Sequence, residues 1–148
     1  MSDRVGAQFL GVCCLILGGL VFRAVGCDRP RVPTYPVKGI VIFKHDRQPL
    51  PGGAIVVAQG LDPPKLRALG IVQEDGTFVL ETERKADGAI AGEQVIIFNP
   101  GFESPPDALR GKIDARYLNL STTPLRITVQ PSSENYFELE IEKPATRR

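Results

Sequence analysis

Two segments near the end of the chain alternate strictly between apolar and polar residues, and this pattern constrains the fold more than any other feature. In residues 125–130, Leu, Ile and Val alternate with Arg, Thr and Gln. In residues 137–142, Phe, Leu and Ile alternate with three glutamates. Because successive side chains of a β-strand point to opposite faces, a period of two predicts strands that are buried on one face only. We therefore expect an all-β domain that ends in two half-buried antiparallel strands.

Five further segments have strand character and are separated by turn signals. They are residues 37–44, 54–59, 66–72, 77–82 and 94–98. Residues 37–44 carry apolar side chains on both faces, so this strand is expected to be covered on both sides or to border an interface. Asp75-Gly76 supplies the positive φ that a tight hairpin needs. Seven strands at a spacing of roughly 8–12 residues predict an antiparallel β-sandwich.

The first part of the chain has a different character. Residues 9–22 are continuously apolar, a length between that of a signal sequence and that of a membrane span, which needs about 20 residues. The tetrapeptide Ala24-Val25-Gly26-Cys27 resembles a bacterial lipobox, in which small residues precede a cysteine that becomes lipidated. We interpret residues 1–26 as a hydrophobic helix that serves as signal peptide or membrane anchor, and Cys27 as the candidate lipidation site.

Alternatives to cleavage and export remain open. Arg23 interrupts the apolar run, and without cleavage residues 5–25 would stay as one tilted span. Arg23, Arg29 and Arg31, taken alone, would place the domain in the cytoplasm by the positive-inside rule. The lipobox and the exported character of the domain favour a membrane-anchored position in the cell envelope, with the domain outside the cytoplasm. A buried core helix is the remaining interpretation of the apolar run.

Domain organisation follows from these segments. Residues 27–36, rich in proline and charge, are expected to form an extended linker. Residues 37–142 form the predicted sandwich, and residues 143–148 a short tail.

Three stretches of the sandwich resemble a known family. GIVIFKHDRQPLPGGAIVV, QEDGTFVLET and DGAIAGEQVIIF are similar to a carboxypeptidase-regulatory-like domain, also called transthyretin-like. The closing stretch, KIDARYLNLSTTPLRITVQPSSENYFELEIE, resembles the tail of small bacterial lipoproteins that carry this domain. The resemblance covers about residues 37–142 and implies an Ig-like sandwich that acts as a non-catalytic accessory, adhesive or scaffolding module. Gln94 departs from the family pattern, which has an aromatic residue there.

The sequence offers little for chemistry. Its single histidine, His45, lies in a turn, and no serine lies in a nucleophile elbow. We therefore expect no enzymatic activity, no cofactor and no metal. Glu74, Asp75 and Asp87 would be the residues of an alternative calcium site, although turn geometry already explains both Asp-Gly pairs.

Charge excludes a general attraction to nucleic acid. The chain has 18 basic and 17 acidic residues, and residues 1–26 hold Arg4, Arg23 and Asp3, so the remainder is neutral. A neutral domain does not concentrate phosphate backbones around itself.

Residues 101–123 are the long irregular segment in which binding residues are most expected. Phe102 and Tyr117 are the candidate ligand contacts. The alternative is that Tyr117 and Leu118 plug the open end of the sandwich. The sequence thus predicts a non-catalytic envelope module that binds another envelope protein, or alternatively a carbohydrate- or peptide-binding accessory domain.

Overall fold

The computed structural model describes residues 31–145, which are all-β apart from one short 3-10 helix. The strands are β1 (Thr34–Tyr35), β2 (Val37–Phe43), β3 (Ile55–Gly60), β4 (Arg67–Ile71), β5 (Thr77–Val79), β6 (Ala89–Ile90), β7 (Gly92–Asn99), β8 (Arg126–Val129) and β9 (Asn135–Ile141); the 3-10 helix η1 spans Ala115–Leu118. The expected N-terminal helix and Cys27 lie outside the described residues. No helix within residues 31–145 has the length and apolar character to cross a membrane.

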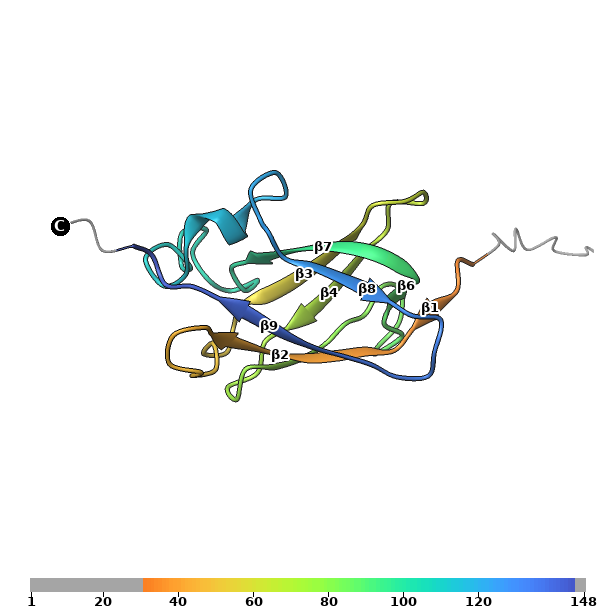
Figure 1. The fold of residues 1–148 in the computed structure, drawn as a ribbon, viewed down its shortest axis with the longest axis horizontal. Helices are drawn as coiled ribbons and strands as arrows, with labels where there is room; N and C mark the ends of the chain where they lie inside the picture. The colour runs from red at the N-terminus through yellow and green to blue at the C-terminus, as the bar shows by residue number, and fades with distance from the viewer. Residues whose placement is uncertain (1–30, 146–148) are drawn as a thin grey trace, which may run out of the picture. The chain divides into compact units, whose positions relative to one another are not determined.

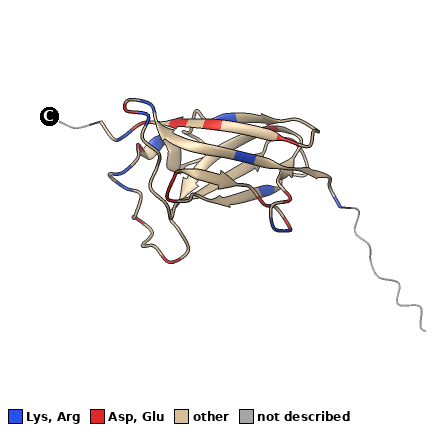
Figure 2. Cartoon of the chain, turned by 90° about the horizontal axis from the view of Figure 1, so that it is seen from below, with Lys and Arg blue, Asp and Glu red and all other residues tan. Residues whose placement is uncertain are grey.

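Seven of these strands form two sheets that face each other (Figure 1). The strand order is β5-β2-β9 in one sheet and β4-β3-β7-β8 in the other, while β1 pairs with β6. All seven coincide with the segments that the sequence predicted. Acidic and basic positions are distributed over both sheets and the loops (Figure 2).

The core lies between the two sheets and is built as the alternation predicted. Ile127 and Val129 of β8 and Leu139 and Ile141 of β9 are each at most 5% exposed, whereas their polar neighbours face outward. The inward residues of both sheets belong to one continuous apolar cluster. Hydrophobic burial therefore fixes the face of each strand, as expected for a sheet with one buried side.

The expectation of an entirely antiparallel sandwich is wrong at one pair. β9 runs parallel to β2, with Val37 opposite Asn135 and Phe43 opposite Ile141. The turn after β8 carries the chain to the other sheet, so the last two strands are not paired with each other. The amide group of Asn135 holds this crossing, because it accepts from the N–H of Gln130 at 2.8 Å and donates to the carbonyls of Gln130 and Pro36.

The predicted linker also includes residues that join the sheet structure. Thr34 pairs with Ile90 and Tyr35 with Ala89, in the loop that follows β5. Gly88 makes this approach possible: its φ is 84°, and a Cβ at this position would overlap the carbonyl oxygen of Tyr35. Two-residue strands carry no periodicity, which is why the sequence pattern does not reveal them.

β4 points its small residues inward and its large ones outward. Ala68 and Gly70 face the core, and Leu69 and Ile71 face away from it. A Cβ at Gly70 would lie 2.7 Å from the carbonyl oxygen of Val79, so the chain leaving β5 passes too close for a larger residue. Because only small residues fit on the inward side of β4, its large apolar side chains lie on the outward side, in contact with solvent.

Candidate functional site

The two aromatic residues predicted as ligand contacts lie in opposite environments. Phe102 is 80% exposed, whereas Tyr117 in η1 is 3% exposed and belongs to the core cluster. The structure therefore corrects the interpretation of Tyr117 as a ligand contact. Its ring closes one end of the sandwich, which is the alternative stated above, while Phe102 remains available.

The segment that carries Tyr117 is tied to the end of β9. The N–H of Asp114 donates to the carbonyl of Glu142 at 2.9 Å. The Asp114 carboxylate caps η1 by accepting from the N–H and the guanidinium of Arg116, both at 3.0 Å, and these hydrogen bonds lower the pKa of Asp114. Burial raises the pKa of the Tyr117 phenol, and the nearby Glu142 charge adds to this effect. These contacts hold Tyr117 as a plug.

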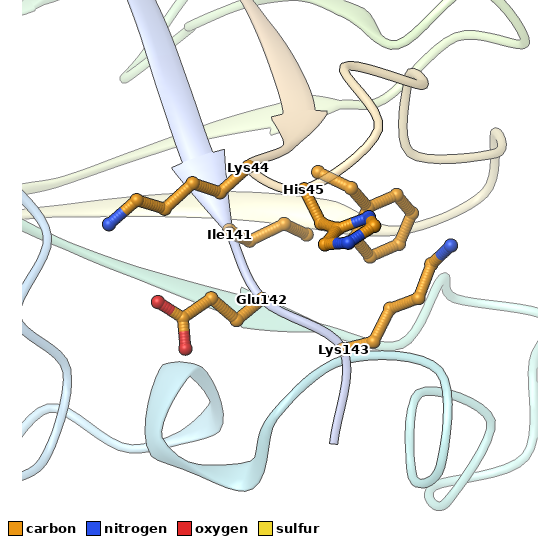
Figure 3. Close-up of a pocket in the computed structure, with 6 residues that line it drawn as sticks. Lys44, His45, Ile141, Glu142 and Lys143 are labelled. Carbon is orange, nitrogen blue, oxygen red and sulfur yellow. The ribbon is translucent and has the colours of Figure 1, made fainter. Parts of the chain in front are cut away.

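An open groove of about 540 Å³ lies beside this end, where β2 and β9 finish (Figure 3). It contains His45, the histidine considered for catalysis. Lys143 lies over the Phe43 ring at 4.7 Å from its centre and donates to the Asp46 carboxylate at 2.8 Å, which lowers the pKa of Asp46. Figure 3 shows Lys44 and Glu142 pointing to one side, and His45 and Lys143 to the other. The polar groups of this groove diverge and do not surround a common point where a reaction could occur.

The carboxylates of the alternative calcium site serve their own turns. Asp75 accepts from the N–H and hydroxyl of Thr77, at 3.0 and 2.6 Å, and the hydroxyl bond lowers the pKa of Asp75. Asp87 accepts from three successive backbone N–H groups, those of residues 82–84. Within residues 31–145 no three metal-binding side chains gather. Turn geometry accounts for both residues.

The outward face of the β4-β3-β7-β8 sheet carries an apolar surface that the sequence interpretation missed. The strand register places Ile71 beside Ile55 in one row, and Leu69, Val57 and Ile97 together in the next. Ile71 is 51% and Leu69 37% exposed on the edge strand β4, whereas Ile55 and Val57 on β3 are buried. The signal was present in residues 66–72, where large apolar residues alternate with alanine and glycine, but alternation alone does not say which set faces inward.

Two hollows lie at opposite ends of this outward face. The first, of about 380 Å³, is lined by Ile55, Ile71, Phe102 and Glu103 together with small residues. The second, of about 350 Å³, is lined by Gln59, Gly60, Leu61, Lys65, Val95, Leu120 and Arg126. We call the first the Phe102 end and the second the Lys65 end. Between them lies the Leu69–Val57–Ile97 row, in which Leu69 is exposed, Ile97 is half-buried and Val57 is buried.

The other outward face is more polar. Glu138 and Glu140 of β9 both lie 2.9 Å from the guanidinium of Arg47 in the turn after β2. Tyr136, which is 63% exposed, precedes them on the same strand. This face is a solvated one with exposed ion pairs, each of which contributes little to stability.

Comparisons with known proteins leave the family open. No family model matches the chain, and no curated protein matches its sequence. Among solved structures the chain is similar to BcpA, the major pilin subunit of Bacillus cereus, with 13% identity and a TM-score of 0.44. The similarity covers 74% of this chain and 30% of that chain, so this chain spans less than a third of the pilin's length.

Proposed function

We propose that this chain is a non-catalytic, envelope-anchored β-sandwich that binds another macromolecule through the outward face of its β4-β3-β7-β8 sheet. The observation that carries the proposal is the exposure of Leu69, Ile71 and Phe102 on one face. Isolated exposed apolar residues are common, but a contiguous apolar surface rimmed by polar residues is typical of an interaction site.

The finer family assignment is part of this proposal. A carboxypeptidase-regulatory-like, Ig-like sandwich is supported by the quoted sequence stretches and by the turns they form. The Asp-Gly turn has Gly76 at a φ of 79°, as a tight turn at Asp-Gly requires, and it connects β4 and β5 of different sheets. Gln94 takes the place of the family's aromatic residue and is 1% exposed; its amide donates to the Ile90 carbonyl at 3.1 Å. A buried, hydrogen-bonded amide thus fills the position.

Anchoring rests on residues 1–27 of the sequence. Lipidation at Cys27 would give the mature protein a diacylglycerol-bearing N-terminus, whereas retention would leave a single span. The intact mass of protein extracted from membranes separates the two outcomes, because it reports cleavage and lipid together. An unmodified chain recovered from the cytosolic fraction would remove the envelope part of the proposal.

A carbohydrate- or peptide-binding accessory role is the second candidate, and the exposure of Phe102 favours it. An aromatic ring on a loop can stack on a sugar, and an edge strand can pair with a peptide. Binding of soluble glycans that is abolished by Phe102→Ser but unaffected by Ile71→Arg would favour this role over the sheet-face role.

The interaction surface itself is tested by photo-cross-linking in envelopes. A photoreactive residue placed at position 71 is expected to yield a cross-linked macromolecule. The same residue at position 136, which is exposed on the opposite sheet, serves as the matched control. Equal yields of cross-linked product at the two positions, or none at position 71, would contradict the proposal.

A further inference from the structure

We propose that the partner of this face is a second copy of the same chain, docked through a two-fold contact in which Phe102 of each copy enters the hollow at the Lys65 end of the other. This inference rests on the proposed function of the sheet face and names its occupant. It is carried by the self-complementary arrangement of shape and charge along that face.

The first element of the argument is the placement of projection and hollow. Phe102 projects at one end of the face and is 80% exposed. The hollow at the other end has about 350 Å³ of space and apolar walls from Leu61, Val95 and Leu120. Ile55 and Gln59, which mark the two ends on β3, are four residues apart, or about 13 Å along the strand. A projection and a matching recess on one face suit a contact between two identical surfaces.

The second element is charge. Glu103 lines the Phe102 end, and Lys65 and Arg126 line the Lys65 end. Arg126 already faces Glu93 at 3.8 Å, whereas Lys65 and Glu103 form no ion pair within residues 31–145. When Phe102 enters the hollow of a second copy, Glu103 comes beside Lys65 of that copy. Complementary charge therefore favours the same orientation as the shape does.

The third element is symmetry. If two such faces stack with their strands antiparallel, each Phe102 end lies over a Lys65 end, and both contacts form at once. Leu69 and Ile97, the accessible residues of the row between the ends, then pack against their counterparts at the two-fold axis. Such an interface is closed, because each copy uses its whole surface on one partner. Sheets that pack in this way lie about 10 Å apart.

The size of the face sets the strength of the contact. Four strands about 4.8 Å apart and about six residues long cover roughly 400 Å² in projection. Stable complexes bury about 800 Å² per partner, so the dimer is expected to be weak when the chain is free. Attachment of both copies to one membrane would raise their effective concentration and favour the dimer.

The experiment measures association of the full-length chain in detergent micelles by sedimentation over a range of protein concentrations. The wild-type chain is expected to show a monomer–dimer equilibrium. Phe102→Ser should weaken it at least about tenfold, as expected for an aromatic anchor. Tyr136→Ser is the matched control, since it removes an exposed aromatic residue from the opposite sheet, and it should leave the equilibrium unchanged.

Charge exchange tests the orientation. Glu103→Lys and Lys65→Glu are each expected to weaken the dimer several-fold, and the double variant should restore it, a result that general misfolding would not give. Carbodiimide treatment of mixed unlabelled and ¹⁵N-labelled chains should yield a peptide pair that joins Glu103 of one copy to Lys65 of the other.

Each contrary result has a defined meaning. A wild-type chain that stays monomeric, a dimer that survives Phe102→Ser, or association that grows into open polymers would overturn the two-fold contact. If the isolated chain is monomeric but position 71 still cross-links to an unlike macromolecule in envelopes, the self-association fails and the proposed function stands. If position 71 yields no cross-link at all, the proposed function fails as well.

Discussion

Replacement of Tyr117 by alanine tests the role of the irregular segment as a plug. The ring is 3% exposed within the core cluster, and removing a large buried aromatic side chain costs about 3–5 kcal/mol because the surrounding structure closes the cavity only partly. In a domain of this size each kcal/mol corresponds to roughly 3–5 °C in melting temperature. We therefore expect Tyr117→Ala to lower the melting temperature by about 9–25 °C.

The assay is thermal and urea unfolding of residues 31–148, followed by circular dichroism. Phe102→Ala in the same segment is the matched control, and at 80% exposure it should change stability by at most about 0.5 kcal/mol. Tyr117→Phe keeps the ring and should cost no more than about 1 kcal/mol. The argument is refuted if Tyr117→Ala costs less than about 1 kcal/mol, or if the two alanine variants are equally destabilised.

Three further predictions follow from particular contacts. Asn135→Ala removes the amide that joins the turn after β8 to the start of β2. It should lower the free energy of unfolding, measured in urea, by about 2–3 kcal/mol. An unchanged urea midpoint would mean that other contacts hold the crossing. Gly88→Ala should destabilise the domain much more than Gly53→Ala. Both glycines have positive φ, but only Gly88 has a neighbouring atom where the Cβ would be. Equal melting temperatures of the two variants would contradict the close approach of residue 88 to β1. The lowered pKa of Asp114 means that the folded state favours the ionised carboxylate. The stability that this carboxylate contributes is therefore fully present above the unfolded pKa of about 4, and it is lost as the pH falls through the lower folded pKa. Asp114→Asn should accordingly make the melting temperature less dependent on pH between about 5 and 2, and a slope equal to that of the wild type would argue against this role.

Local pattern was sufficient to locate the seven strands of the two main sheets but not to pair them. The alternation in residues 125–130 and 137–142 identified β8 and β9 and the faces they bury. It did not reveal that these strands belong to different sheets or that β9 runs parallel to β2. Alternation records which side of a strand is buried, whereas the choice of neighbour depends on contacts such as those of Asn135, which join residues distant in sequence.

The candidate site was predictable only in part, for a related reason. The sequence identified Phe102 and Tyr117 as aromatic residues in one polar segment, yet one is exposed and the other buried. The difference arises from the contact between Asp114 and the Glu142 carbonyl, which draws the η1 region onto the end of the sandwich. The outward position of Leu69 and Ile71 depends on the close passage of residue 79 beside Gly70, and hydrophobicity alone favours the opposite orientation.

The most direct test of the interaction surface is a dilution series of amide NMR spectra from ¹⁵N-labelled residues 31–148. We predict concentration-dependent shifts at the Lys65 end, along β4 and at Phe102 and Glu103, with the signals of Lys38, Tyr136 and Glu138 unchanged. Shifts confined to the β5-β2-β9 sheet, or spectra that do not change up to millimolar concentration, would contradict the account.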